Sequence, residues 1–372
     1  MSQPAVLFGG PSPEHDVSIL TGLQAVHALA RSGAVTAIYW AKTGDFFTVD
    51  PSSEGGDFAG GVPKGSKELR LVASPGGGFV AAKGGMLGKE RPLEISAVVN
   101  CCHGGPGEDG TLQAALDLAG VAYSGPTVAG ASLGMDKLAF GGAVVSAGLP
   151  SLARSLIEPG RPGSPPRSNG PYIVKPRFGG SSIGIEVVED WATAVALVKN
   201  NVHLRRGAVV EAYLPSSYDL NLAVRTWPEL QLSAIERPLR SAGSAEILGY
   251  RDKYLGGDGM VSAPRELPAD IGEGLEKALR DAASSVAALA LVRGVARIDF
   301  LIDGNDWYVN EVNTIPGSLA KYLWVEPAPV GFTALLADLL AEARQRPSAR
   351  YDATGADGTA LRSAGSIAGK LG

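Results

Sequence analysis

Two short segments near residue 300, in which polar side chains stand between apolar ones, constrain the fold most. Strands are predicted at 296–302 and 307–310, joined by a turn at 303–305. Successive side chains of a strand point to opposite faces. Two polar pairs therefore share a face each: Arg297 and Asp299 on the first strand, and Glu311 and Asn313 at the end of the second.

These four side chains suit phosphate and metal chemistry. Carboxylate and amide oxygens are hard ligands of the kind that hold Mg²⁺ together with substrate phosphates. An arginine beside such a metal neutralises charge while a phosphoryl group moves. For any one residue the alternative is a polar edge on a pair of surface strands. The four together, followed by Pro316-Gly317, favour a functional site.

A second candidate site is the glycine-rich turn 176–182, between strands predicted at 172–175 and 183–188. Such turns expose backbone N–H groups that can bind phosphate oxygens. Lys175 on the preceding strand, and Lys137 in a helical stretch that ends near residue 148, can add positive charge. A flexible hairpin turn is the structural alternative.

The first 40 residues predict a β-α-β unit. An apolar strand at 5–8 leads to a helix that ends near residue 30, and a second strand follows at 35–40. Ser12 is expected to be the N-cap of the helix and Pro13 its first residue. The G-x-G-x-x-G spacing of dinucleotide-binding units is absent, which argues against a dehydrogenase.

Glu14 and His103 stand at strand-to-helix turns, where open α/β sheets bind ligands. The alternatives are that Glu14 compensates a helix dipole and that His103 is a satisfied turn histidine. Cys101 and Cys102 lack the C-x-x-C spacing of metal sites and are expected to be buried. The stretch 42–92 is rich in glycine and proline, and we expect an irregular insertion with a hairpin.

Charge and composition exclude several classes of protein. The 372 residues carry a formal net charge of −5, which disfavours binding to nucleic acid or to an anionic membrane. There is no apolar run as long as a membrane span, no basic start typical of a signal peptide, and no disulfide framework. We therefore expect a multidomain cytoplasmic protein.

Seven motifs stand in a fixed order: EHDVS (14–18), HGGPGEDGTLQAAL (103–116), MDKLAF (135–140), KPRFGGSSIG (175–184), VVEAYL (209–214), ARIDF (296–300) and NEVNTIPG (310–317). Together they resemble the D-alanine–D-alanine ligase family of the ATP-grasp superfamily. The resemblance implies an α/β (α+β) ATP-grasp fold. Its parts would be an N-terminal pre-ATP-grasp α/β domain (1–125), a central ATP-grasp subdomain (126–214), a C-terminal ATP-grasp and metal-binding domain (215–345) and a flexible tail (346–372).

The same resemblance implies roles for the matching residues. ATP would be bound by Lys137, Lys175, Gly180, Ser182, Glu211, Ala212, Leu214, Asp219 and Lys253. Two Mg²⁺ ions would be bound by Asp299, Glu311 and Asn313, with Arg297 on the transferred phosphate. The first amino acid would be held by Glu14 and His103. Glu14, Ser181 and Tyr254 would form a hydrogen-bonded triad, and the backbone N–H of Gly317 would join Arg297 at the oxyanion.

Two segments depart from the family pattern. After residue 317 the family continues Thr-x-x-Ser-Leu, which binds the carboxylate of the second amino acid. Here Tyr322 stands at the serine position, between Lys321 and Leu323. The segment 248–252, before Lys253, is Leu-Gly-Tyr-Arg-Asp instead of Tyr-Asp-Tyr-Glu-Ala. We therefore expect D-alanine to be a poor acceptor. The alternative is that Ser318 takes the serine's role in an ordinary D-alanine–D-alanine ligase.

These observations predict an ATP- and Mg²⁺-dependent carboxylate–amine ligase that works through an acyl phosphate. Its partners would be small amino acids or amines, with neither nucleic acid nor membrane. The family is commonly dimeric, so a homodimer is an open expectation. Two other functions remain open: an amide ligase of specialised metabolism that uses a different amine, and a non-catalytic ATP-binding regulator.

Overall fold

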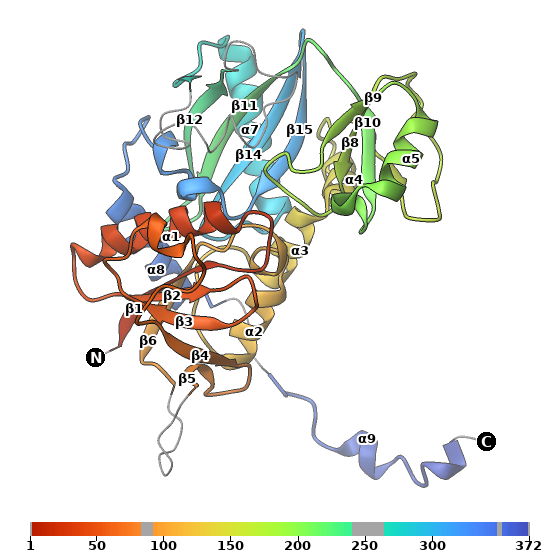
Figure 1. Ribbon diagram of the computed structural model, residues 1–372. Helices are drawn as coiled ribbons and strands as arrows, with labels where there is room; N and C mark the ends of the chain where they lie inside the picture. Colours follow the sequence, from red (N-terminus) through yellow and green to blue (C-terminus); the bar gives the residue numbers. More distant parts are fainter. Residues whose placement is uncertain (1, 83–91, 240–263, 348–351, 371–372) are drawn as a thin grey trace, which may run out of the picture.

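The computed structural model describes residues 2–82, 92–239, 264–347 and 352–370. These residues form three β-sheets with helices packed against them (Figure 1). Lys253, Tyr254 and the divergent segment 248–252 lie outside the described residues. Within the described ranges, no helix combines the length and the apolar character that crossing a membrane requires.

The first sheet has six strands in the order β5-β4-β3-β2-β1-β6. The strands are β1 (Gln3–Gly9), β2 (Thr36–Trp40), β3 (Phe46–Val49), β4 (Lys67–Val72), β5 (Gly78–Ala81) and β6 (Ile95–Asn100). β1 pairs in parallel with β2 and β6, whereas β3, β4 and β5 extend the sheet by antiparallel pairing. The hairpin expected within 42–92 is present as β4 and β5, but the expectation that the described part of this stretch is otherwise irregular is wrong, because β3 to β5 continue the sheet. Its short apolar segments gain regular structure by pairing outward from β2, which buries Leu69 and Phe79.

The other two sheets are antiparallel. One has the order β7-β10-β8-β9, with β7 (Ser155–Ile157), β8 (Tyr172–Pro176), β9 (Glu186–Val188) and β10 (Ala208–Ala212). The other has the order β13-β12-β11-β14-β15, with β11 (Tyr218–Arg225), β12 (Gln231–Pro238), β13 (Arg265–Glu266), β14 (Val295–Asp303) and β15 (Asp306–Asn313). The predicted hairpin around residue 304 is thus the β14–β15 pair, with Asp299 opposite Glu311.

Helices cover these sheets. The α-helices are α1 (His15–Ala30), α2 (Thr111–Ala119), α3 (Val128–Met135), α4 (Lys137–Ser146), α5 (Trp191–Asn200), α7 (Glu273–Leu289), α8 (Phe332–Gln345) and α9 (Thr359–Arg362). Short 3₁₀ segments are η1 (Gly55–Phe58), η2 (Gly105–Gly107), η3 (Val202–Leu204), η5 (Gly317–Leu323) and η6 (Ala368–Lys370). Figure 1 shows α9 projecting away from the three sheets.

Helix α1 begins at His15, so the prediction of Ser12 as its N-cap is wrong. The Ser12 hydroxyl accepts a hydrogen bond from the backbone N–H of Glu14 at 3.2 Å and donates to the carbonyl of His103 at 2.7 Å. A serine hydroxyl can bond to nearby backbone in place of a helix N–H. Here it joins the turn after β1 to the turn after β6 and brings Glu14 and His103 into one region.

The predicted single helical stretch through Lys137 is two helices, because Asp136 interrupts it. The Oδ1 atom of Asp136 accepts the backbone N–H groups of Leu138 and Ala139 at 3.1 and 3.2 Å, which makes Asp136 the N-cap of α4. Aspartate is among the residues that most favour this position. Lys137 is consequently the first residue of α4.

Helix α8 returns the chain to the first sheet. Its leucines 335, 336, 339 and 340 are buried in one cluster with Val6, Phe8 and Val99. Figure 1 shows α8 next to α1, and the 3₁₀ segment η5 just before it contacts both α1 and β14. The first and third sheets therefore meet at η5, close to the predicted site residues of β14 and β15.

Candidate active site

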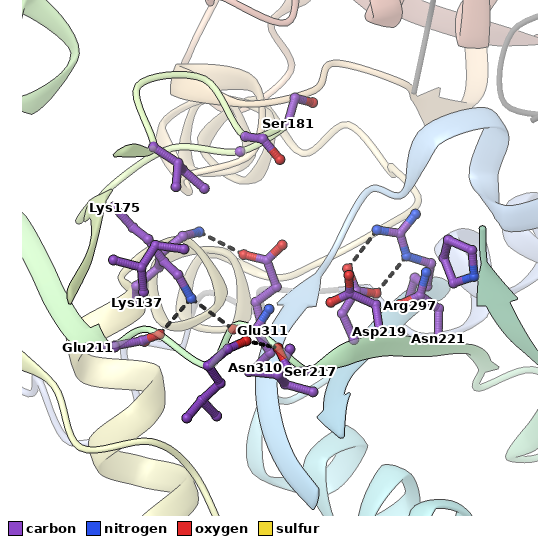
Figure 2. Close-up of a pocket in the computed structure, with 18 of the residues that line it drawn as sticks. Lys137, Lys175, Ser181, Glu211, Ser217, Asp219, Asn221, Arg297, Asn310 and Glu311 are labelled. Atoms are coloured by element: carbon purple, nitrogen blue, oxygen red, sulfur yellow. Dashed lines mark hydrogen bonds and ion pairs between the residues drawn. The ribbon is translucent and has the colours of Figure 1, made fainter. Parts of the chain in front are cut away.

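A cleft lies between the two antiparallel sheets (Figure 2). Every predicted ATP-binding residue that the structure describes lines it, namely Lys137, Lys175, Gly180, Ser182, Glu211, Ala212, Leu214 and Asp219. Figure 2 shows Lys137, Lys175 and Glu211 on one side and Arg297 and Asp219 on the other, with Ser181 above them. The topology thus gathers residues from five separate motifs into one space, namely those at 135–140, 175–184, 209–214, 296–300 and 310–317.

A buried ion-pair network fixes Lys175. Its ammonium donates to Glu211 Oε2 at 2.6 Å and to Asn310 Oδ1 at 3.2 Å. The other Glu211 oxygen, Oε1, accepts from Arg154 Nε at 2.7 Å. Burial opposes ionisation of Glu211, but the charges of Lys175 and Arg154 outweigh it and hold the pKa of this carboxyl below its usual value. The two cations and one carboxylate leave one net positive charge at the cleft.

Lys137 projects from the N-terminus of α4 toward the same space. Its ammonium lies 2.9 Å from Glu311 Oε2 and donates to the carbonyl of Gly179 at 2.8 Å. Gly179 begins the glycine-rich tip of the loop between β8 and β9. Lys137 therefore connects that loop to strand β15.

Strands β14 and β15 present the predicted metal ligands. Asp299 accepts two hydrogen bonds from Arg297, each at 2.7 Å, and one from Asn313 Nδ2 at 3.0 Å. Across the ladder, Asp299 faces Glu311. In the described part of the chain, no three His, Cys, Asp or Glu side chains group as a metal site. The predicted set has two carboxylates and one amide, and its cationic neighbours are Arg297 and Lys137.

A second, smaller cavity opens beside the cleft. Glu14, His103, Asn313 and Gly317 line it but not the cleft. Both spaces are lined by Lys137, Gly179, Gly180, Ser181, Arg297 and Glu311. The Ser181 hydroxyl hydrogen-bonds to the Glu14 carboxylate, which ties the glycine-rich loop to the first sheet. The two cavities therefore meet at Arg297 and Glu311.

His103 is buried and uncharged near pH 7. Burial, and to a smaller extent the charge of Arg297, lowers the pKa of His103 to about 4. The imidazole Nε2 lies 2.9 Å from the Thr21 hydroxyl. The neutral imidazole therefore supplies no positive charge to the smaller cavity.

Two family models match this chain. The family model described as D-ala D-ala ligase N-terminus matches residues 3–126. The family model described as D-ala D-ala ligase C-terminus matches residues 167–340. A D-alanine–D-alanine ligase of Campylobacter lari is 31% identical over 321 residues, which cover 86% of this chain and 88% of that protein. The chain belongs to the D-alanine–D-alanine ligase family.

Other members of the family extend the match. A D-alanine–D-alanine ligase of a Bradyrhizobium species is 31% identical over 353 residues, which cover 92% of this chain and 95% of that protein. The crystal structure of D-alanine–D-alanine ligase from Helicobacter pylori superposes with a TM-score of 0.74 at 24% identity and covers 94% of this chain and 100% of that one. The predicted ATP-grasp fold with an N-terminal α/β domain is confirmed. So is the prediction of an ATP-dependent ligase of the D-alanine–D-alanine ligase type.

The residues that depart from the D-alanine–D-alanine ligase pattern occupy different places. Tyr322 lines the cleft, where its hydroxyl accepts a hydrogen bond from Arg297 Nη1 at 3.4 Å and its ring lies 4.5 Å from the Arg265 guanidinium. Lys321 lies 4.7 Å from the Phe332 ring on α8, and Leu323 is buried in the core. The backbone N–H of Ser318 donates to the Thr21 hydroxyl at 3.1 Å. Among the described residues Ser318, Lys321, Tyr322 and Leu323, only Tyr322 lines one of the two cavities, and that cavity is the cleft.

Sequence reasoning missed two residues that organise this site. Arg154 donates to Glu211, to the carbonyl of Asn310 and to that of Lys137. Glu108 accepts from the backbone N–H groups of Gly104 and Ile315 at 2.9 Å each. A lone arginine in a loop gives no local signal. Glu108 stands inside the motif 103–116, and that motif could have pointed to it.

Proposed function

We propose that the chain joins the carboxylate of a D-amino acid to an amine by way of an acyl phosphate, with ATP bound in the cleft between the antiparallel sheets. The observation that carries this proposal is that the cleft and the smaller cavity meet at Lys137, Arg297 and Glu311. A phosphoryl group bound in one space can reach a carboxylate held in the other. The names of the relatives point to D-alanine as the first amino acid.

The donor set near Arg297 fits the two Mg²⁺ ions of this proposal. Asp299, Glu311 and Asn313 offer hard oxygen ligands on neighbouring strands. Both carboxylates contact cationic side chains in this structure, Glu311 through Lys137 and Asp299 through Arg297, so their oxygens already act as partners of positive charge. Bound Mg²⁺ would supply charge neutralisation for the phosphates.

Each of the following residues of the chain has its own role in the proposed reaction. Glu14 holds the ammonium of the first amino acid, and Ser181 keeps the Glu14 carboxylate in place. Lys137 and Lys175 bind the phosphates of ATP, and Arg297 neutralises the phosphoryl group as it passes to the carboxylate. The amine of the second substrate attacks the acyl carbon, Arg297 and the Gly317 N–H stabilise the oxyanion, and phosphate leaves.

The second part of the proposal is that Tyr322 disfavours D-alanine as the acceptor. The Tyr322 ring forms part of the cleft wall next to Arg297, and the Arg265 guanidinium lies over this ring. Burial raises the pKa of Tyr322 to about 12, so its hydroxyl stays protonated. Ser318, the alternative residue for the family serine, lies against Thr21 of α1. An acceptor of a size other than D-alanine, or an amine that is not an α-amino acid, fits this wall better.

One experiment tests both parts. Phosphate release from ATP is measured over D- and L-amino acids and other small amines, and products are identified by mass. We expect D-alanine to be activated as the first substrate, with a kcat/KM for D-alanine as acceptor below about 10⁴ M⁻¹s⁻¹. A higher value would reject the role of Tyr322, and no release with any amino acid would reject the ligase proposal itself.

Two variants separate the ring of Tyr322 from its hydroxyl. Tyr322→Ser should improve the use of D-alanine as acceptor about ten- to a hundredfold, because a hydroxyl bonded to a carboxylate contributes roughly 1.5–3 kcal/mol. Tyr322→Phe keeps the ring and should bring no gain. Equal effects of the two substitutions would contradict a steric role of the ring.

We also propose a cytoplasmic location, since ATP is consumed there, and a homodimer, which is common in the family. Sedimentation of the purified chain at several concentrations tests the second point. A monomer at all concentrations would exclude it.

A further inference from the structure

The base of the glycine-rich loop is bound to helix α4 by an ion pair that has no place in the proposed chemistry. Arg177, the first residue after β8, donates from Nε to Asp136 Oδ1 at 2.9 Å and from Nη2 to Asp136 Oδ2 at 2.6 Å. This two-point geometry is the strong form of an arginine–carboxylate contact. Neither of these two described side chains lines the cleft or the smaller cavity, so any effect on the reaction passes through the loop or through Lys137, the residue that follows Asp136.

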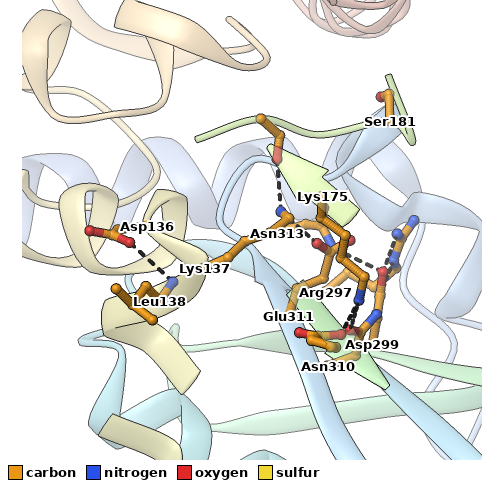
Figure 3. Close-up of polar contacts among 12 residues, drawn as sticks. Asp136, Lys137, Leu138, Lys175, Ser181, Arg297, Asp299, Asn310, Glu311 and Asn313 are labelled. Carbon is orange, nitrogen blue, oxygen red and sulfur yellow. Dashed lines mark hydrogen bonds and ion pairs between the residues drawn. The ribbon is translucent and has the colours of Figure 1, made fainter. Parts of the chain in front are cut away.

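Asp136 fixes two structures with one carboxylate. It caps α4 through the N–H groups of Leu138 and Ala139, and it holds Arg177 at the same time. A backbone hydrogen bond joins the same two segments, because the N–H of Lys137 donates to the carbonyl of Arg177 at 3.1 Å. Figure 3 shows Asp136 and Leu138 at the start of α4, apart from Arg297, Asp299 and Asn313. The pair therefore sets where the loop leaves β8 relative to Lys137.

The tip of the loop has a conformation that needs support. Ser181 and Ser182 adopt φ angles of 53° and 58°, in the left-handed region that L-residues disfavour. The tip is held by the Ser181 hydroxyl on Glu14 and by the Gly179 carbonyl on Lys137. These contacts keep their positions only if the base of the loop is fixed as well.

The Asp136–Arg177 pair has the properties of a persistent contact. The side chain of Asp136 is 12% exposed and that of Arg177 is 23% exposed, so water screens the pair less than it screens an exposed surface pair. Burial opposes ionisation of Asp136, but hydrogen bonds from Arg177 and from the α4 backbone outweigh it and lower the pKa of this carboxyl. The pair thus remains charged at neutral pH.

We propose that Asp136 and Arg177 are positioning residues that hold the loop 177–184 over the cleft before ATP binds. The inference rests on the proposed function and on the predicted binding of ATP by Gly180 and Ser182, which belong to this loop and line the cleft. A preformed loop spares ATP the entropic cost of ordering it. When the pair is broken, ATP has to order the loop on binding, so its affinity falls.

The test compares four full-length variants with the wild type. Asp136→Asn keeps an Oδ1 acceptor that can cap α4, but it removes the charge that Arg177 needs. Arg177→Gln removes the guanidinium, and Arg177→Lys keeps the charge without the two-point geometry. Arg206→Gln is the matched control. The Arg206 guanidinium lies 4.5 Å from the ring of Phe178, a residue of this loop, and the Arg177 guanidinium lies 4.9 Å from the same ring.

Calorimetry gives the Kd of ATP for each variant. Asp136→Asn and Arg177→Gln should each raise Kd about tenfold or more, Arg177→Lys should raise it less, and Arg206→Gln should stay within twofold. The double variant Asp136→Asn/Arg177→Gln should be no weaker than the weaker single variant, since both remove one interaction. A Kd within twofold of wild type for Asp136→Asn or Arg177→Gln, or additive losses in the double variant, would overturn the proposal.

Hydrogen exchange supplies a readout that needs no ATP. Backbone amides of 177–184 should exchange faster in Asp136→Asn and Arg177→Gln than in wild type, while the rest of the central sheet keeps its protection. Unchanged exchange in this segment would also overturn the proposal. If wild type itself bound no ATP, the proposed function would fail, and the exchange rates alone would decide whether the pair holds the loop.

Discussion

Each of three cations at the cleft contacts a carboxylate. Lys175 contacts Glu211, Arg297 contacts Asp299, and Lys137 contacts Glu311. Lys137 and Glu311 differ from the other two pairs, because both also line the smaller cavity, where the two proposed substrates meet. Glu311 is therefore the carboxylate whose charge is best placed to serve both a metal and the acyl transfer.

Replacing Glu311 by Gln tests the metal assignment at the residue scale. The substitution keeps the shape of the side chain but removes its charge, so turnover should fall at least about 100-fold. Glu311 is 25% exposed, and a partly exposed ion pair contributes about 0–1 kcal/mol, so the melting temperature should move little. Steady-state phosphate release against Mg²⁺ concentration measures the effect. Turnover near that of wild type at low Mg²⁺ would discard the assignment.

The buried neutral His103 predicts a pH dependence of stability. Its pKa in the folded chain, about 4, lies below the ordinary value of 6.5. The unfolded chain therefore binds more protons between these values, and the stability that His103 contributes above pH 6.5 is lost as the pH falls toward 4.

Urea unfolding between pH 7 and pH 4.5 checks this prediction. His103→Gln removes the titration, so the free energy of unfolding should fall less steeply with pH in this variant than in wild type. Other acidic groups act equally on both chains and cancel in the difference. Parallel profiles for the two proteins would show that His103 takes up no proton in this range.

At the scale of elements, strands with local signals could be predicted and strands that depend on a partner could not. β14 and β15 carry alternating residues and a turn at 303–305, which are local in sequence. β3 to β5 are short and surrounded by glycine and proline, and their pairing with β2 decides their conformation. Arg154 could not be placed either, because its partners Glu211 and Asn310 are 57 and 156 residues away.

The glycine-rich loop leads to a testable prediction at this scale. A Cβ atom on Gly180 would lie 2.8 Å from Glu14 Oε2, which is closer than real Cβ atoms approach, and 3.1 Å from Oε1, which is a tight contact. Gly180→Ala should therefore displace the Glu14 carboxylate or the loop tip and raise the KM of the first amino acid about tenfold or more. Initial rates at saturating ATP measure this KM.

Gly142→Ala is the matched control for this substitution. A Cβ on Gly142, in helix α4, would meet no atom within 4 Å. The exchange should leave KM unchanged and stabilise the helix by about 0.5–1 kcal/mol. A similar KM in the two variants would show that Gly180 does not set the position of Glu14.

At the scale of the whole molecule, the chain crosses from the first sheet to the other two and then returns. The resemblance to the family implied three regions in order, and nothing in the sequence indicated that α8 would pack in the core of the first sheet. The reason is that an amphipathic helix shows which face is buried and gives no sign of its partner. Arg293 adds a second connection, since its guanidinium donates to the carbonyls of Tyr123 and Gly125 at 2.7 and 2.8 Å.

This return predicts that the first and last parts of the chain share their stability. Leu336 on α8 is fully buried in the cluster that contains Val6 and Phe8. Leu336→Ala should cost about 2–5 kcal/mol of the free energy of unfolding, the range for buried leucines that leave a cavity. Because α8 contacts β6, the loss should reach strands that lie more than 200 residues earlier in the sequence.

Hydrogen exchange combined with urea unfolding measures how far this loss of stability extends from α8. Amides of β1 and β6 should lose protection in Leu336→Ala together with those of α8, because one core supports all three. Leu361→Ala is the control, since Leu361 is 82% exposed on α9 and its removal should change the free energy of unfolding by no more than about 0.5 kcal/mol. Loss of protection in α8 alone would mean that the helix can detach while the first sheet stays folded, and that the two ends of the chain are stabilised separately.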